Sequence, residues 1–319
     1  MRIWKLTLIF ALALILLGCN TKNNSEIKIG VIPVEDNFPF FVADAEGMFH
    51  KAGLKVELVP FNSARDRDLA LQAGNIDGAV ADIVASGLLR KAGVPVKIVC
   101  LTMGTTPAEG RFALLAKPGW KPQSIRDLKG KKVALSENTI IEYVTDRLLQ
   151  EAGLEPEEVE KIPVPQIPER LHLLLAGKVE AALLPDPLAS LAEKQGARTL
   201  LDDTKLKRNI SQVVLVMSER TLSKYPQETK KLIQVYGEAA RVVTAQPEKY
   251  RRLFIEKARL PQELQDTYLT PKFAPPRLPR PEEVSDVIEW MLKKGLITKP
   301  FSYTDLVSAD FLPAGGREQ

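Results

Sequence analysis

The chain has 319 residues, of which 45% are hydrophobic and 26% charged. This is ordinary globular composition, with length for about two domains of roughly 150 residues each. Its 44 basic and 40 acidic residues are interspersed and give a formal net charge of +4, which argues against a nucleic-acid-binding protein, whose electrostatic footprint is a clustered basic face.

The N-terminal segment is typical of an export signal. Two basic residues precede an apolar run at 6–17 that contains one polar residue, Thr7. As a helix this run rises only about 18 Å, which is too short for a bilayer core of roughly 30 Å. The letters LLGC, ending at Cys19, resemble a bacterial lipobox. We therefore expect a lipoprotein signal peptide at 1–18, lipidation of Cys19 and a polar tether at 19–26. The alternative is an ordinary cleaved signal with a chance cysteine.

Removal of the signal leaves a nearly neutral protein. Residues 1–18 contain two of the 44 basic residues and no acidic one, so 42 basic residues face 40 acidic ones in the mature chain. Cys100 is the other cysteine of the chain. If Cys19 is lipidated, no intrachain disulfide can form.

Strands and helices alternate in the first part of the chain. A Ser63–Asp66 pair is a capping-box-like helix start, and Asp82 is a good N-cap for the next helix. The alternation predicts a mostly parallel sheet with helices on both faces. Apolar runs predict strands at 27–32, 55–59, 78–81 and 96–101, and helical patterns lie at 40–51, 63–74 and 82–93.

The same order recurs in the second part. We expect strands at 131–135, 161–164, 179–184 and 197–201, and helices at 139–153, 168–177 and from Asp186 onward. Extended patterns at 111–117 and 211–219 predict two connecting strands. Helical patterns then follow at 226–245, 247–257 and 282–294, and the proline-rich segment 271–281 is typical of an extended strap.

An internal repeat supports two similar lobes. Residues 71–93 reappear without a gap at 174–196, with identical pairs such as Gly74 and Gly177. Two similar lobes imply a cleft between them. If the chain leaves the first lobe and returns to it, the expected limits are 27–112 and 216–319 for lobe I and 113–215 for lobe II, with hinge strands near 111–117 and 211–217.

The candidate ligand-binding residues lie where strands end. In an open parallel sheet, ligands bind outside the carboxyl ends of the strands, where helix N-termini present unpaired N–H groups. Thr139 with Glu142 is a second capping-box pattern, and Asp186 followed by Pro187 predicts a helix that begins at the cleft. The candidates are Asn37, Phe38, Ser63, Asp82, Ser136, Glu137, Asn138, Thr139, Pro185 and Asp186.

Two alternatives stay open for these residues. Each polar one could cap only its own helix, which contributes roughly 1 kcal/mol, and Phe38 could be core packing rather than a stacking surface. The charge of the ligand is also undecided. Carboxylates near the cleft favour N–H donors or a cation, whereas helix N-termini and three arginines suit an anion: Arg65, Arg67 and Arg111.

Signatures of enzymes are sparse. The chain has no GxxxxGK[ST], GxGxxG, HExxH or CxxC motif. His50 and His172 lie in separate helical patterns, so no metal site is expected, and no cofactor is expected either. Cys100 ends an apolar strand, where a buried inert thiol is the preferred interpretation and a nucleophile is the alternative.

Several segments carry a family resemblance. IGVIPVEDNFPFFVADAEGMFHKAGLKVELV, QAGNIDGAVAD, the PDP segment and WMLKKGLITKPFSYTDLVSADFLP resemble the type II periplasmic binding proteins of ABC importers. The most similar group binds nitrate, sulfonates and taurine, or the pyrimidine precursor of thiamine. The cysteine-rich segment of a related pyrimidine-forming enzyme is absent.

The resemblance implies a two-lobed α/β fold with two crossing hinge strands. It also implies a non-enzymatic, monomeric receptor outside the cytoplasm, anchored by lipid at Cys19, which captures a small solute and delivers it to a membrane permease driven by an ATPase. An enzyme on the same scaffold, and a sensor or adhesion lipoprotein that does not transport, are the alternatives, because fold does not fix function.

Overall fold

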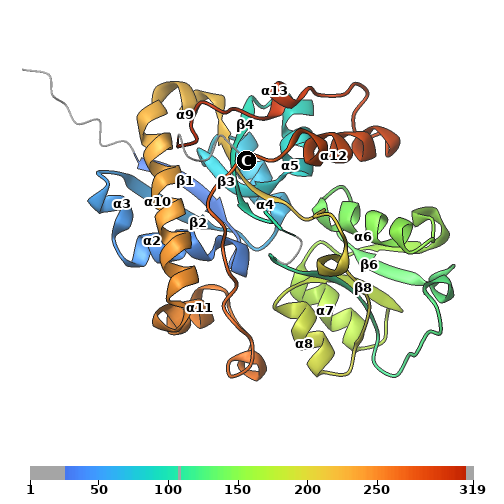
Figure 1. Ribbon diagram of the computed structural model, residues 1–319. Helices are drawn as coiled ribbons and strands as arrows, with labels where there is room; N and C mark the ends of the chain where they lie inside the picture. The colour runs from blue at the N-terminus through green and yellow to red at the C-terminus, as the bar shows by residue number, and fades with distance from the viewer. Residues whose placement is uncertain (1–25, 107–108, 314–319) are drawn as a thin grey trace, which may run out of the picture.

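A computed structural model of the chain describes residues 26–106 and 109–313. Within these residues the chain forms two lobes, each built on its own five-stranded sheet (Figure 1). The predicted signal peptide and Cys19 lie outside the described residues, so both stay predictions. No helix of the described part of the chain is long and apolar enough to cross a membrane.

The first sheet has the strand order β2-β1-β3-β10-β4. β1 pairs in parallel with β2 and β3, whereas β10 runs antiparallel between β3 and β4. Every residue of β3 is buried, as expected for a strand covered on both faces. The strands are β1 (Glu26–Val31), β2 (Lys55–Pro60), β3 (Gly78–Asp82), β4 (Val96–Met103) and β10 (Val213–Ser218).

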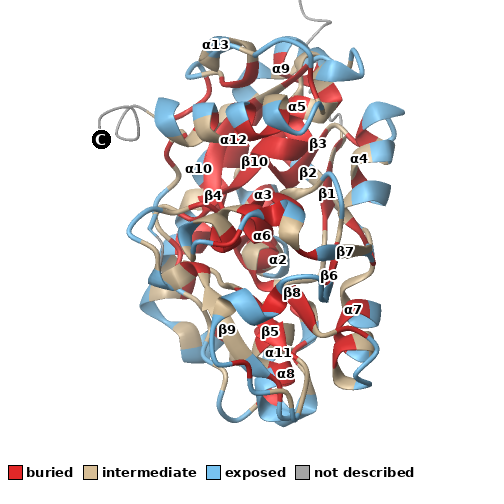
Figure 2. Cartoon of the chain, turned by 90° about the vertical axis from the view of Figure 1, so that its right-hand side faces the viewer, coloured by how far each residue is buried: buried red, intermediate tan, exposed pale blue. Residues whose placement is uncertain are grey.

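The second sheet repeats this arrangement with the order β7-β6-β8-β5-β9. β6 is parallel to β7 and β8, and β5 is antiparallel to β8 and β9. Burial is concentrated on the other strands of the two sheets, whereas the edge strands β2, β7 and β9 contain no buried residue (Figure 2). The strands are β5 (Phe112–Ala116), β6 (Lys132–Leu135), β7 (Glu160–Pro163), β8 (Ala181–Pro185) and β9 (Arg198–Asp202).

The helices between the strands lie close to the predicted positions. The predicted single helix at 40–51 is wrong, because Gly47 adopts a left-handed φ of 62° and divides the segment in two. The helices are α2 (Phe38–Ala45), α3 (Met48–Lys51), α4 (Ala64–Gln72), α5 (Ile83–Lys91), α6 (Ile140–Glu151), α7 (Ile167–Leu175) and α8 (Leu188–Lys194), with short 3-10 turns η1 (Glu35–Asn37), η2 (Ile125–Leu128), η3 (Pro156–Glu158) and η4 (Asp203–Lys205).

The sequence repeat corresponds to a structural one. The alignment that pairs 71–93 with 174–196 places β3 on β8 with the same bounds, and it extends back to place α4 on α7, also with the same bounds. Gly74 and Gly177 end α4 and α7 with left-handed φ angles of 73° and 68°. The two lobes therefore present equivalent helix N-termini.

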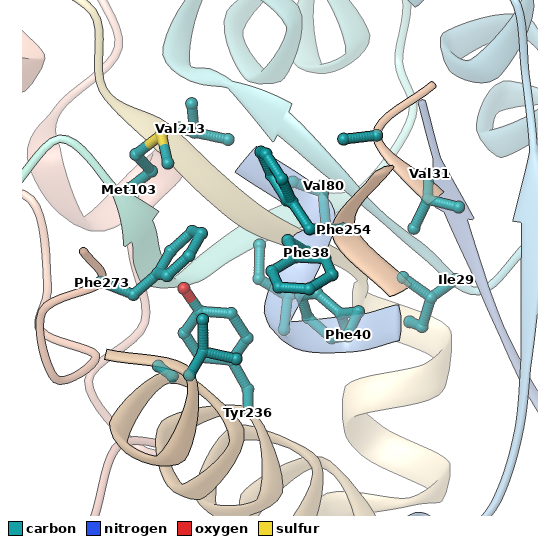
Figure 3. Packing of buried hydrophobic residues seen from close by; sticks show 14 of the residues in the cluster. Ile29, Val31, Phe38, Phe40, Val80, Met103, Val213, Tyr236, Phe254 and Phe273 are labelled. Atoms are coloured by element: carbon teal, nitrogen blue, oxygen red, sulfur yellow. The ribbon is translucent and has the colours of Figure 1, made fainter. Parts of the chain in front are cut away.

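Most of the C-terminal third packs on the first lobe. Phe40 of α2 contacts Tyr236 of α10, and Phe38 contacts Phe254 of α11, each with ring centroids 4.9 Å apart (Figure 3). In the proline-rich strap, the Arg277 carbonyl accepts the Leu101 N–H at 2.6 Å. The elements are α9 (Glu219–Lys224), α10 (Pro226–Ala245), η5 (Pro247–Tyr250), α11 (Arg251–Lys257), η6 (Gln262–Leu264), α12 (Pro281–Lys293) and α13 (Tyr303–Leu306).

The chain passes between the lobes twice, and the described residues of these two crossings are 104–106 with 109–111, and 206–212. The predicted hinge strands mostly coincide with β5 and β10, which lie inside the sheets, and the crossings precede them. The Asn209 side chain donates a hydrogen bond to the Gly104 carbonyl and so ties the two crossings together. Gly104 has a φ of 90°, and a Cβ there would lie 2.6 Å from the Asn209 amide nitrogen. The predicted residue limits of the lobes stay predictions.

The lobes also touch through two helices, because α12 lies beside α6 (Figure 1). An edge-to-face contact joins Tyr143 and Trp290, with centroids 5.5 Å apart. The polar contacts run from Tyr143 Oη to Asp286 at 2.5 Å, from Arg147 to Asp286 at 3.0 Å, from Trp290 Nε1 to Asp146 at 2.9 Å and from Lys294 Nζ to Glu142 at 2.7 Å. We call this set the α6–α12 contact.

Candidate functional site

Three adjoining pockets form a trough between the lobes. The middle pocket has a volume of about 100 Å³ and shares Arg65, Ser136 and Thr139 with a neighbour of about 410 Å³. It shares Ile167 and Pro185, among others, with a second neighbour of about 290 Å³. Because both lobes contribute to the walls, the trough can hold a small molecule against both at once.

Most of the predicted ligand-binding residues line this trough. Asn37 and Phe38 do not, because both lie in the interior at 1% and 0% exposure. Phe38 packs on Phe254, and the Asn37 amide nitrogen donates to Asp36. The lining residues are Ser63, Asp82, Ser136, Glu137, Asn138, Thr139, Pro185 and Asp186.

Three of these residues also cap helices, as expected. Ser63 Oγ accepts the N–H of Asp66 at 3.2 Å, and Asp82 Oδ1 accepts that of Ala85 at 2.8 Å. Thr139 Oγ1 accepts the N–H of Ile141 at 3.2 Å. The same residues therefore cap helices and line the trough. The N-termini of α4, α5 and α6 point at the middle pocket.

Two details of the predicted caps are wrong. The Glu142 carboxylate accepts the N–H of Asn138 at 2.8 Å rather than that of Thr139, so no capping box forms. Asp186 is not the formal N-cap of α8, because its own N–H bonds the Arg111 carbonyl at 2.9 Å and prolongs the strand pairing. Pro187 is the N-cap and the helix begins at Leu188, although Asp186 still accepts the Ser190 N–H at 2.9 Å.

The lobe I side of the middle pocket contains a compensated arginine. Arg67 is 4% exposed. It donates to the Val80 carbonyl at 2.8 Å and pairs with Asp68 at 2.8 Å. Burial raises the pKa values of Asp36 and Asp82 to about 6, and the positive charge of Arg67 opposes this shift. Carboxylates thus surround the Arg67 cation.

The lobe II side contains a different arginine. Arg170 of α7 is 0% exposed and belongs to the lining of the middle pocket. Its Nη1 donates to the Val164 carbonyl at 3.2 Å, but Nε and Nη2 have no hydrogen-bond partner within the described residues. Burial lowers the pKa of Arg170 to about 9, so the side chain is a cation at neutral pH. Sequence reasoning missed Arg170, which the alignment of Arg67 in the repeat could have identified.

An acidic cluster adjoins the other end of the trough. Burial and then the charge of Asp186 raise the pKa of Glu35 to about 8. Tyr268 donates its hydroxyl to Glu35, and Arg111 lies 3.6 Å from Asp186. Glu35 of η1 and Asp186 beside α8 come from opposite lobes, so their repulsion acts across the cleft.

The other candidate chemistry has little support. Among the described residues, no group of three or more His, Cys, Asp and Glu side chains could hold a metal ion. Cys100 in β4 is 0% exposed, and burial raises the pKa of its thiol. A buried, protonated thiol is a poor nucleophile.

Solved structures share this fold. The aliphatic sulphonate binding protein SsuA of Escherichia coli is 18% identical with a TM-score of 0.75, over 92% of this chain and 95% of the other. The nitrate-binding protein NrtA of Synechocystis is 18% identical with a TM-score of 0.66, over 76% and 69%. A cysteine-to-serine mutant of DszB in complex with biphenyl-2-sulfinic acid is 13% identical with a TM-score of 0.63, over 90% and 97%.

These matches confirm the type II periplasmic-binding-protein fold that the sequence predicts; at such identities they are evidence for the fold alone. A search of curated proteins finds no match to this sequence. A family model described as the NMT1-like family matches residues 20–255, well over half of the sequence. The chain therefore belongs to the NMT1-like family.

Proposed function

We propose that this protein is an extracytoplasmic solute-binding lipoprotein of an ABC importer. It captures a small organic solute in the trough and delivers it to a membrane permease. The solute is a sulfonate, a related small anion or a thiamine-type pyrimidine precursor. The observation that carries the proposal is a trough lined by both lobes, where α4 and α7 of the repeat occupy equivalent positions.

This geometry supports capture rather than chemistry. A solute in the trough touches helix N-termini and polar side chains of both lobes at once, and only a closed arrangement provides both sets. Its higher affinity for the closed state therefore shifts the lobes toward closure. The permease would then recognise the closed form, and lipidated Cys19 would keep the protein near the membrane.

Thermal-shift measurement of the purified protein tests the proposal. Sulfonates, amino acids, pyrimidines and inorganic anions form the panel, because a ligand at 100 times its dissociation constant adds about 2.7 kcal/mol to the free energy of unfolding. We expect one class to raise the melting temperature and to reduce the radius of gyration. Turnover of a panel compound by the protein would instead favour an enzyme.

A further inference from the structure

The repeat places two buried arginines at equivalent positions of the trough. The alignment that pairs α4 with α7 pairs Arg67 with Arg170, each in the second turn of a nine-residue helix that faces the cleft. Both belong to the lining of the middle pocket. Each lobe therefore buries a guanidinium away from water, which is energetically costly unless a partner compensates the charge.

In lobe I, carboxylates of the protein compensate the charge of Arg67. Asp68 lies 2.8 Å from Arg67, and Asp36 and Asp82 add negative charge nearby. The repeat has lost these partners in lobe II, because Leu171 aligns with Asp68, and Pro185 aligns with Asp82. In the described structure no carboxylate pairs with Arg170, and two of its nitrogen atoms lack a hydrogen-bond partner.

The start of α7 reinforces the positive character of this side. Its N-cap, Gln166, makes no side-chain capping hydrogen bond. The first turn carries the positive end of the helix dipole, although Pro168 has no N–H to offer and the exposed Glu169 carboxylate partly opposes the dipole. The buried cation is therefore the stronger reason to expect an anion on this wall.

Resting on the proposed function, we propose that the transported solute carries an oxyanion, such as a sulfonate, carboxylate or sulfate group, and that Arg170 is the residue that binds it. The anion supplies the counter-ion that Asp68 supplies to Arg67 in the other lobe. The middle pocket, about 100 Å³, suits a small head group, and the wider pockets on either side accommodate the remainder of the solute.

A stability comparison tests the uncompensated charge without knowledge of the solute. Arg170→Met removes a buried cation that lacks a partner, so its ligand-free melting temperature should equal or exceed that of the wild type. Arg67→Met leaves three carboxylates without their cation and should melt earlier. If Arg170→Met melts earlier by as much as Arg67→Met, Arg170 is structural and the inference is overturned.

Anion titration tests the binding role. Sodium sulfate, methanesulfonate and acetate are compared with sodium chloride at equal ionic strength. At least one should raise the melting temperature of the wild type and of Arg126→Gln, an exposed control on lobe II. Arg170→Gln should bind that anion at least tenfold more weakly, and Arg170→Lys should retain part of the affinity. Equal shifts in wild type and Arg170→Gln, or no shift in the wild type, would overturn the assignment.

The proposed function and this inference fail separately. Suppose that a compound without an oxyanion closes the lobes of wild type and of Arg170→Gln equally. This result would support the solute-binding function and contradict the assignment of Arg170 as an anion site. Conversely, oxyanion binding could depend on Arg170 and leave the radius of gyration unchanged. This result would support the anion site and contradict capture by closure of the lobes.

Discussion

Buried acids at the cleft make stability depend on pH. The folded protein keeps the proton of Glu35 up to about pH 8, whereas the unfolded chain loses it near its ordinary pKa of 4.5. The folded state therefore binds more protons over this range, and the free energy of unfolding falls as pH rises. Asp36 and Asp82 contribute in the same direction up to about pH 6.

Glu35→Gln should flatten this dependence. The amide cannot ionise, so the variant should be more stable than wild type at pH 8, with the difference diminishing toward pH 4.5. Urea unfolding at a series of pH values measures the effect, and Glu289→Gln, exposed on α12, is the control. A parallel pH profile for wild type and Glu35→Gln would show that Glu35 does not hold a proton in the folded protein.

Glu137 separates binding from stability. Its side chain is exposed and lines the trough. We expect Glu137→Ala to weaken solute binding tenfold or more, about 1.4 kcal/mol, with little change in melting temperature. Calorimetric titration with the solute from the thermal-shift panel measures this. A variant that binds normally but melts early would assign Glu137 to local structure.

At the residue scale, local sequence patterns predicted which residues cap helices better than they predicted which residues are buried. Ser63, Asp82 and Thr139 cap helices as their side-chain chemistry requires. Burial of Phe38 depends on α11, more than two hundred residues further along the chain, so no local pattern could distinguish a core aromatic from a stacking surface. Arg170 stands among leucines, and its lack of a partner follows only from the packed cavity.

At the scale of elements, the α6–α12 contact joins the lobes away from the trough. Asp286 is its central acceptor, since Tyr143, Arg147 and Arg208 all bond to its carboxylate, at 2.5, 3.0 and 3.1 Å. The contact can only form when α12 of one lobe and α6 of the other are close. Its hydrogen bonds and ion pairs hold the two lobes in the arrangement described here.

Asp286→Ala should shift the ligand-free protein toward an open state. The expected result is a larger radius of gyration by X-ray scattering in solution, together with a loss of stability of about 1–3 kcal/mol. Glu289→Ala, on the same helix and exposed, should leave both unchanged. If Asp286→Ala scatters like the wild type, the contact does not control the closure of the lobes.

Element boundaries show what sequence periodicity cannot resolve. The apolar pattern at 40–51 continues through Gly47, so the pattern alone predicts one helix where the left-handed glycine makes two. The Pro185-Asp186-Pro187 turn has cap-like residues, but pairing of the Asp186 N–H with the neighbouring strand delays the helix. The first error arises because apolar periodicity does not register the left-handed preference of a glycine, and the second because strand pairing overrides the local preference of Asp186 for a helix N-cap.

At the scale of the whole molecule, most of the predicted architecture came from the internal repeat. It gave two lobes and a cleft, because a duplicated unit must place its helix N-termini at equivalent positions of two sheets. The placement of the C-terminal third followed from the two returning strands. The crossings themselves lie before the predicted hinge strands, because β5 and β10 are absorbed into the sheets as antiparallel members.

Closure should be visible in tryptophan fluorescence. The chain has three tryptophans, and one of them lies in the predicted signal. Trp290 donates to Asp146 across the lobes and is 3% exposed. Solute that favours closure should therefore change its emission. The change should vanish in Trp290→Phe and persist in Trp120→Phe. The reverse pattern would place the motion elsewhere.

The link between Asn209 and Gly104 has a mechanical consequence. Two crossing segments that moved independently would allow the lobes to twist and slide against each other. Crossing segments joined by a hydrogen bond act instead as a single hinge. Relative motion of the lobes would then be confined to one arc, and a solute bound as proposed would meet the same pair of surfaces each time. A side chain at position 104 would displace the Asn209 amide and would also be strained at a φ of 90°, so it should break this link.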